Sequence, residues 1–172
     1  IKALALQIGR LIEYAQICRT SEFTYQTVKK YLNFLEKTFI CGFPKPFFKN
    51  KRKEIVKNPK VYFFDTGLRN FIVNDFRGLA DREDAGHLLE NTAAMQILKR
   101  ELPLNFWRTK QKQEIDFIVE LENGKRIALE IKKTAEGAAG TAEFNRDYPD
   151  IPVAILFYHG KASPKALPVY FI

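Results

Sequence analysis

The sequence has few cysteines, which limits the kinds of site that the chain can contain. Cys18 and Cys41 are the two cysteines among 172 residues. Their spacing matches no zinc-binding pattern, and two cysteines form no disulfide framework. We therefore expect both to be reduced thiols in the core of a cytoplasmic protein.

The sequence also lacks a long hydrophobic run. No apolar stretch approaches the roughly 18 residues that a membrane-spanning helix needs, and no signal peptide is visible. We therefore expect no membrane partner. Because the chain begins at Ile1 rather than at a methionine, we expect it to be a piece of a longer protein.

Aromatic residues and positive charge are abundant instead. With 46% hydrophobic residues, 15 Phe and 7 Tyr, the chain can bury a core as one domain or as two small ones. Residues 1–84 contain 16 Lys and Arg against 9 Asp and Glu, a balance of +7, whereas residues 85–172 contain 12 against 11, a balance of +1. The basic excess therefore belongs to the N-terminal half, where residues 45–60 contain seven basic residues and one acidic residue.

Residues 114–133 are predicted to form a β-hairpin. A two-residue Asn123-Gly124 loop would place apolar residues opposite charged ones. A three-residue loop, with Gly124 in the left-handed conformation, shifts the register by one and pairs Phe117 with Leu129. A slip of one residue moves every side chain to the other face, so the apolar pattern selects the second register.

This register gives the hairpin an apolar face and an acidic face. The apolar face pairs Phe117 with Leu129, Ile115 with Ile131 and Val119 with Ile127. The other face places Asp116 opposite Glu130, with Lys132 two residues further along. Opposed carboxylates repel by roughly a few tenths of a kcal/mol unless a cation lies between them. Lys132 and a divalent metal ion would supply that charge, as a magnesium-dependent phosphodiesterase requires. The alternative is the solvated outer face of an edge hairpin.

Residues 1–74 are predicted to form a winged helix-turn-helix. Residues 11–20 and 21–37 have helical periodicity, and Ser21 or Thr24 caps the second helix. Strands are expected at 39–43 and 60–64, on either side of the basic segment, as in a wing.

The polar side of the second helix and the basic segment form a candidate DNA-binding surface. It consists of Tyr25, Gln26, Lys29, Lys30, Lys51, Arg52 and Lys53. Clustered cations and aromatic side chains in a chain of pI about 9.5 are typical of polyanion-binding surfaces. The alternative is a helical module that binds a protein partner or nothing.

Residues 75–85 are polar and poorly periodic, and they are predicted to link the first unit to a second unit at 86–172. Before them, residues 63–73 run from a strand into a helix that Asp65 or Thr66 caps.

The second unit begins with a helix at 86–102, in which Glu90 lies within the apolar stripe. A buried acid needs a partner. The alternative is a glutamate in the first turn of the helix that is tilted to water.

The remaining elements predict an α/β (α+β) fold. Strands are expected at 105–110, 114–121 and 125–133, a short helix at 141–147, and strands at 152–160 and 167–172. Together with the preceding helix they form a sandwich around a small mixed sheet.

The order of Glu in a helix, Asp in the second strand and Glu-x-Lys in the third resembles the PD-(D/E)xK nuclease superfamily, which includes restriction endonucleases and Holliday junction resolvases. The resemblance implies an αβββαβ core, Glu90, Asp116 and Glu130 as catalytic metal ligands, Lys132 as the catalytic lysine, and Mg²⁺ or Mn²⁺ as the cofactor. The proline of the motif is absent, because Ile115 precedes Asp116.

Six short segments resemble the C-terminal region of bacterial and archaeal AAA-type ATPases, in which a P-loop ATPase precedes a winged helix and a nuclease-like domain. The segments are "TVKKYLNFLEKTFI", "PKVYFFDTGL", "HLLEN", "FWRT", "EIDFIVE" and "LEIKK". No G-x-x-x-x-G-K-[ST] motif occurs in the 172 residues. The resemblance therefore implies an ATPase domain upstream of Ile1 as a partner in cis, and ATP would bind there.

Two functions are compatible with these features. The first is a Mg²⁺-dependent DNA endonuclease module of the ATPase, favoured by the presence of all four site residues. The second is a nuclease-like domain without catalysis that binds DNA or a protein and regulates the ATPase. The loose segment 134–150, where the superfamily has a substantial helix, favours the second.

Overall fold

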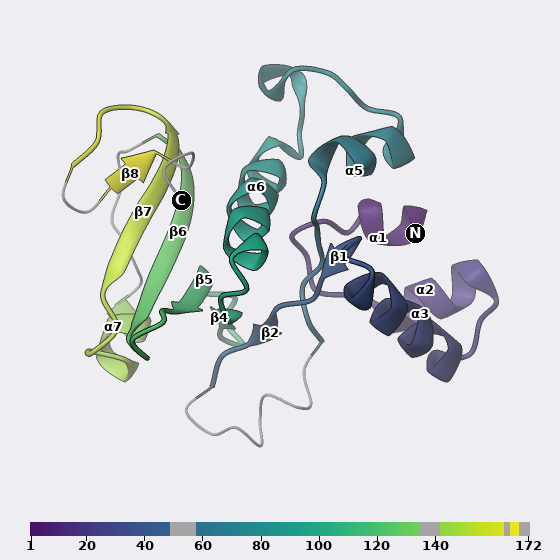
Figure 1. Ribbon diagram of the computed structural model, residues 1–172, viewed down its shortest axis with the longest axis horizontal. Coiled ribbons are helices and arrows are strands. Elements are labelled where there is room, and N and C mark those ends of the chain that lie inside the picture. The colour runs from purple at the N-terminus through teal and green to yellow at the C-terminus, as the bar shows by residue number, and fades with distance from the viewer. Residues whose placement is uncertain (49–57, 135–141, 164–165, 169–172) are drawn as a thin grey trace.

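The chain places helices on one side and a mixed sheet on the other, with helix α6 (Ala85–Lys99) between them (Figure 1). This computed structural model describes residues 1–48, 58–134, 142–163 and 166–168. The expected mixed α/β class is confirmed. No helix within those ranges is long and apolar enough to cross a membrane.

Two helices of the N-terminal unit meet at a tight turn. Helices α2 (Tyr14–Ser21) and α3 (Tyr25–Lys37) are joined by three residues, of which Glu22 is left-handed with φ 58°. The Thr24 hydroxyl accepts a hydrogen bond from the Thr27 N–H at 3.2 Å, which caps α3. A short helix α1 (Lys2–Ala5), which the periodicity does not reveal, precedes them.

The strands of the N-terminal unit are shorter than expected and pair with two different partners. Strands β1 (Cys41–Gly42) and β3 (Tyr62–Phe63) pair antiparallel, with Cys41 opposite Phe63. Strand β2 (Lys45–Pro46) runs parallel to β4 (Leu104–Arg108) and thereby joins the sheet of the second unit. The first unit therefore contributes an edge strand to the second.

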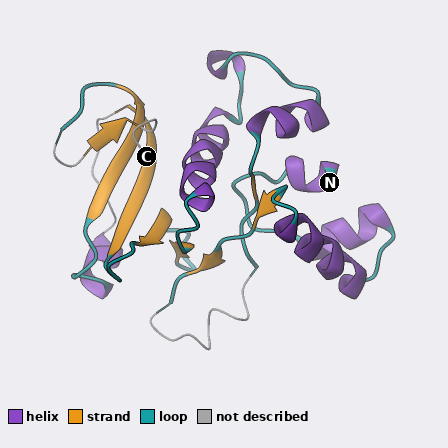
Figure 2. Cartoon of the chain, in the orientation of Figure 1, coloured by secondary structure: helices purple, strands orange, loops and turns teal. Residues whose placement is uncertain are grey.

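The six-stranded sheet has the order β2-β4-β5-β6-β7-β8. Its other strands are β5 (Glu114–Glu120), β6 (Arg126–Thr134), β7 (Val153–His159) and β8 (Ala166–Pro168). β4, β5 and β6 are antiparallel neighbours, whereas β6, β7 and β8 are parallel. Figure 2 shows most of this sheet away from the N-terminal helices, whereas strand β1 of the small sheet lies beside them.

Each face of this sheet is covered by one helix. On one face Ala93, Ala94 and Ile97 of α6 pack against Phe117, Leu129 and Leu156. On the other face Phe144 of the short helix α7 (Ala142–Asp147) packs against Trp107, Ile118 and Ala128. The sheet is therefore the middle layer of a sandwich.

The hairpin between β5 and β6 has the predicted register. Phe117 lies opposite Leu129 and Val119 opposite Ile127, and Gly124 is left-handed with φ 74°. The apolar pattern and the turn residue act locally, because they are close in sequence. The prediction is therefore confirmed for the distal part of the hairpin.

The expected alternation fails near the start of β5. Asn105 pairs with Ile118 and Trp107 with Ile115, so two residues of β5 oppose the single residue Phe106 of β4. Because of this β-bulge, the side chains of the preceding residues lie on the opposite face of the sheet from the one that simple alternation predicts. Ile115 consequently packs with Trp107 on the α7 face, not beside Phe117 as expected. Asp116, expected on the opposite face from Phe117, turns towards α6.

The segment expected to be a linker is tied to helix α5 (Thr66–Val73) of the first unit by an ion pair and contains further ion pairs of its own. It contains a 3₁₀ turn, η1 (Leu79–Asp81). The buried Arg69 of α5 lies 2.6 Å from the Asp84 carboxylate, and the buried Arg82 lies 2.8 Å from the same group. The predicted cap of α5 is confirmed, because the Asp65 carboxylate accepts a hydrogen bond from the Leu68 N–H at 2.9 Å.

Candidate functional site

A cavity of about 590 Å³ opens between the N-terminal segment, α6 and the start of the hairpin. Three of the four predicted catalytic residues line it, namely Glu90, Asp116 and Lys132. The other lining residues are Gly9, Arg10, Leu11, Glu13, Lys60, His87, Arg108 and Glu114. Five of these eight precede residue 61, so the cavity belongs to both units.

Glu90 extends from α6 into this cavity. Its Oε2 accepts a hydrogen bond from the Tyr62 hydroxyl at 3.1 Å and lies 3.7 Å from Lys60 Nζ. Burial raises the pKa of Glu90, but His87, Lys60 and Tyr62 outweigh burial, so the net pKa is lowered. The prediction that Glu90 lies away from the wet face of its helix is confirmed, because its side chain is only 15% exposed.

Asp116 enters the same cavity because of the bulge. Its Oδ2 accepts a hydrogen bond from the Ile131 backbone N–H at 2.8 Å, across the gap between β5 and β6. Burial and then the negative charge of Glu90 raise the pKa of Asp116 to about 7. The sequence predicts Glu130 as the acid that repels Asp116, whereas Glu90 is the main acidic influence on its pKa.

Glu130, the third predicted acid, contacts Lys132. It is buried, and its Oε2 lies 2.8 Å from Lys132 Nζ. It does not line the cavity, whereas Lys132 does. Hydrogen bonding to Glu130 and the charges of Glu130 and Asp116 raise the pKa of Lys132, although burial opposes them. Lys132 is therefore a protonated cation that interacts with both acids.

Lys60 is the cavity residue that sequence reasoning missed most clearly. Its side chain is only 2% exposed, and its ammonium group forms an ion pair with Glu114. Arg108 Nη1 lies 3.3 Å from the same carboxylate. The signal in the sequence is a lysine directly before the apolar run "VYFF". Lys60 is also the last residue of the basic segment 45–60, so its sequence context predicts a surface cation.

The N-terminal segment closes one side of the cavity. Gly9 is left-handed with φ 71°, and a Cβ atom there would lie 2.6 Å from His87 Nδ1. A side chain at this position would therefore collide with the histidine. His87 Nδ1 is buried without a hydrogen-bond partner in the described part of the chain, 3.5 Å from Glu90 Oε1.

Two carboxylates of this cavity, from Glu90 and Asp116, fit a hard divalent cation. Asp116 carries a carboxylate whose negative charge is poorly compensated, and the carboxylate of Glu90 lines the same cavity. Mg²⁺ in proteins is commonly held by one or two carboxylates, while water and phosphate oxygens complete its shell. Glu90 and Asp116 therefore fit one such ion. Across the described ranges no group of three His, Cys, Asp or Glu residues could hold a metal, so the three-acid ligand set that includes Glu130 stays a prediction.

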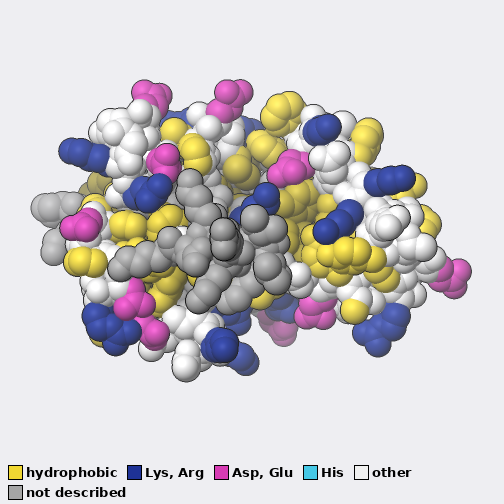
Figure 3. All heavy atoms as spheres, turned by 90° about the horizontal axis from the view of Figure 1, so that it is seen from below, with side chains coloured by type: hydrophobic (Ala, Val, Ile, Leu, Met, Phe, Trp, Pro, Cys, Tyr) yellow, Lys and Arg dark blue, Asp and Glu magenta, His cyan; other side chains and the backbone are white. Residues whose placement is uncertain are grey.

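The described part of the candidate nucleic-acid surface lies on α3. Tyr25, Gln26, Lys29 and Lys30 are all exposed, and Lys29 Nζ lies 4.8 Å from the centre of the Tyr25 ring. Lys and Arg side chains surround exposed hydrophobic surface at this end of the molecule (Figure 3). The predicted residues Lys51, Arg52 and Lys53 lie outside the described residues.

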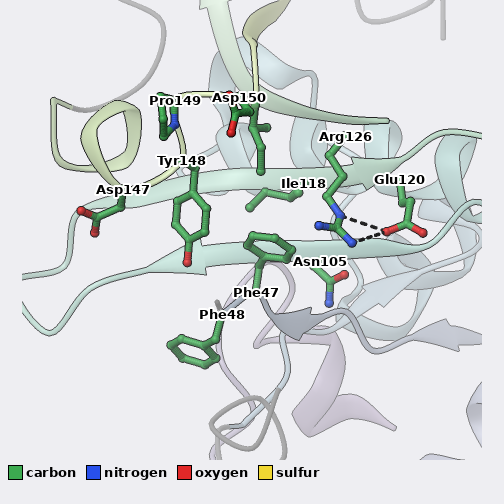
Figure 4. Close-up of a pocket in the computed structure, with 11 residues that line it drawn as sticks. Phe47, Phe48, Asn105, Ile118, Glu120, Arg126, Asp147, Tyr148, Pro149 and Asp150 are labelled. Atoms are coloured by element: carbon green, nitrogen blue, oxygen red, sulfur yellow. Dashed lines mark hydrogen bonds and ion pairs between the residues drawn. The ribbon is translucent and has the colours of Figure 1, made fainter. Parts of the chain in front are cut away.

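A second cavity, of about 530 Å³, opens on the α7 face of the sheet. Phe47 and Tyr148 line it, with ring centroids 5.3 Å apart, and Arg126 lies above the Phe47 ring (Figure 4). Arg126 also donates two hydrogen bonds to Glu120, whose side chain is 41% exposed. This ion pair is therefore in contact with water.

The chain matches two family models, one for each part. Residues 1–81 match "Domain of unknown function (DUF8612)", and residues 85–168 match "Domain of unknown function (DUF4143)". The two parts of the chain are therefore similar to two different domains of unknown function. The second of these is commonly associated with AAA-type ATPases.

Two curated proteins are similar to the chain. They are "Uncharacterized protein Mb2031c" of Mycobacterium bovis and "Uncharacterized protein Rv2008c" of Mycobacterium tuberculosis. Each is 33% identical over 139 residues, which are 77% of this chain and 31% of the relative. The matched part of the chain thus spans about a third of the length of either relative. No solved structure matches the chain.

Proposed function

We propose that the chain is a divalent-cation-dependent phosphodiesterase module that acts on DNA within an ATPase-associated protein. One observation carries the proposal: the bulge at Asp116 brings its half-buried carboxylate into one cavity with Glu90 and Lys132. A β-bulge that turns an acid of raised pKa into a cavity is a common device of active sites.

The distribution of charge in the cavity suits a phosphodiester. Two of its acids lie towards the interior with Lys60, since the side chains of Glu90 and Glu114 are 15% and 23% exposed. The cations Arg108 and Lys132 are more exposed, at 31% and 41%. An anionic backbone could therefore approach the cations while a metal ion binds to the acids behind them.

The chain's own residues would then divide the work. Glu90 and Asp116 would hold the cation, which when bound supplies Lewis acidity and a water of lowered pKa. Lys132 would bind the phosphate and compensate the charge that develops on it. Glu130, which contacts Lys132, would fix the position of that ammonium group.

The test is cleavage of duplex, single-stranded and branched DNA with Mg²⁺ or Mn²⁺, using both this chain and a longer protein that includes the ATPase. Lys132→Met should lower the rate on the order of 10²–10³-fold, the usual cost of losing one stabilising donor. Asp116→Asn should remove metal-dependent cleavage. Lys112→Met is the matched control, because that lysine is exposed on the β4–β5 turn. Equal cleavage by Asp116→Asn and the wild type would refute the proposal.

The second candidate function is a module without catalysis that binds DNA or a protein and regulates the ATPase. It is favoured by the ion pairs that already occupy Glu90, Glu114 and Glu130. In this case the same preparations should bind DNA but cleave none of the substrates with either metal ion.

Binding itself is tested on α3. Lys29→Glu with Lys30→Glu should weaken binding to all DNA sequences and flatten its log–log salt dependence by about 0.9 for each phosphate group that the protein no longer neutralises. Lys99→Glu with Arg100→Glu, two exposed cations at the end of α6, makes the same change of charge elsewhere. Equally weakened binding in both double variants would indicate an effect of net charge alone.

A further inference from the structure

Lys60 places a buried positive charge at the back of the acidic cavity. Its side chain is 2% exposed, its ammonium group pairs with Glu114, and Nζ lies 3.7 Å from Glu90 Oε2. The ring of Phe106 lies 5.4 Å from the same nitrogen. A lysine is rarely this buried unless it is paired, because desolvation of the charge is costly.

The backbone of the N-terminal unit fixes this lysine in place. Its N–H donates a hydrogen bond to the Pro44 carbonyl at 3.1 Å. Tyr62 follows two residues later in the same extended segment, so both side chains leave on one side. Both reach Glu90, the tyrosine by a hydrogen bond and the lysine by its charge. The first unit therefore supplies two partners of an acid on α6.

The ammonium group of Lys60 lies where it would repel a metal ion bound in the same cavity. A divalent ion held by Glu90 and Asp116 would lie near the ammonium group, because that group lies beside the same Glu90 side chain. Like charges a few ångströms apart repel strongly where water is scarce. Lys132 is in a different position, since its side chain is 41% exposed and water screens its charge.

We propose that Lys60 is a positioning residue that lowers the metal affinity of this cavity: its charge holds the acids together without metal and opposes the binding of a divalent ion. This inference rests on the proposed metal-dependent function. It makes the first unit part of the metal site, because the residue that opposes the ion belongs to that unit. Glu114 moderates the opposition by neutralising part of the charge of Lys60.

Calorimetry with Mn²⁺ on the complete 172-residue chain tests this inference through a double-mutant cycle. Lys60→Met should bind Mn²⁺ at least about tenfold more tightly than the wild type, because a repelling charge is gone. Glu114→Gln should bind several-fold more weakly, roughly, because the charge of Lys60 is then uncompensated. The double variant loses both charges and should return to within about threefold of the wild type. Lys112→Met, an exposed lysine, should match the wild type.

The double-mutant cycle still tests the inference if Lys60→Met fails to fold. The double variant removes both partners of the buried pair, which proteins tolerate far better than the loss of one. Recovery of affinity from Glu114→Gln to the double variant would then support the inference. A double variant as weak as Glu114→Gln would overturn it, because Glu114 would then act as a metal ligand. Equal affinity of Lys60→Met and the wild type would overturn it as well.

The Asp116→Asn variant distinguishes two outcomes: the absence of the proposed metal site, and a metal site that Lys60 does not affect. If Mn²⁺ binds equally to the wild type and Asp116→Asn, or to neither, the proposed metal function fails and the Lys60 inference fails with it. If Asp116→Asn abolishes binding while all three members of the Lys60 cycle match the wild type, only the role of Lys60 is refuted.

Discussion

The two faces of the central sheet each carry a lysine or arginine paired with a glutamate beside an aromatic ring. On the α6 face the pair is Lys60 with Glu114 beside Phe106, and on the α7 face it is Arg126 with Glu120 beside Phe47. The lysine is 2% exposed, whereas the arginine is 43% exposed. Similar ion pairs therefore occur in two environments, and access to water decides how much each pair contributes to the free energy of unfolding.

Breaking the buried pair should have the largest effect. We expect Lys60→Met to lower the free energy of unfolding by about 3–5 kcal/mol, because it leaves Glu114 and Glu90 without their buried counter-charge. Urea denaturation at neutral pH measures this change. Replacing both partners, Lys60 and Glu114, by Met and Gln should restore most of the stability. A decrease below about 1 kcal/mol would mean that the lysine moves out to water.

The ion pairs beside α6 extend the comparison to a second buried cluster. Asp84→Asn should cost about 2–3 kcal/mol, since it withdraws the carboxylate shared by the buried Arg69 and Arg82. Thermal denaturation against Asp81→Asn, an exposed aspartate three residues earlier, gives the matched control. Equal melting temperatures for the two variants would contradict this expectation.

Asp116 should make stability depend on pH. Its pKa is about 7 in the folded chain against an ordinary 3.8, so between these values the folded state binds more protons than the unfolded state. The stability from this group is therefore greatest at low pH and falls as pH rises from about 4 to about 7, by up to about 1.4 kcal/mol per pH unit. Asp116→Asn should flatten that part of the profile. Parallel profiles for the two proteins would exclude Asp116 as the source.

The exposed pair should give the smallest effect. Glu120→Gln should change the free energy of unfolding by less than about 1 kcal/mol, because water already screens both charges. Added salt should reduce this small effect further while leaving that of Lys60→Met largely unchanged. A cost above about 2 kcal/mol, measured by urea denaturation, would show that exposure does not separate the two faces.

Much of the local structure could be predicted because its causes lie within a few residues. The alternation from Phe117 to Glu120 and the glycine at 124 specify the hairpin register, and Thr24 and Asp65 cap the helices that follow them. The apolar stripe of α6 likewise predicts that Glu90 is shielded from water. Each of these signals needs only the chain's own periodicity or one capping side chain.

The assembly of the cavity depended on interactions between distant residues. The bulge that turns Asp116 towards α6 arises where β4 and β5 change register, and no single strand's pattern contains it. Lys60 looks like a surface cation in the sequence, because its partners Glu90 and Glu114 lie at least 30 residues away. The sequence alone determined most of the elements, the register of the distal hairpin and three of the residues that line the cavity. Only the tertiary structure decided which charges lose their water, since burial is produced by packing between segments far apart in the chain.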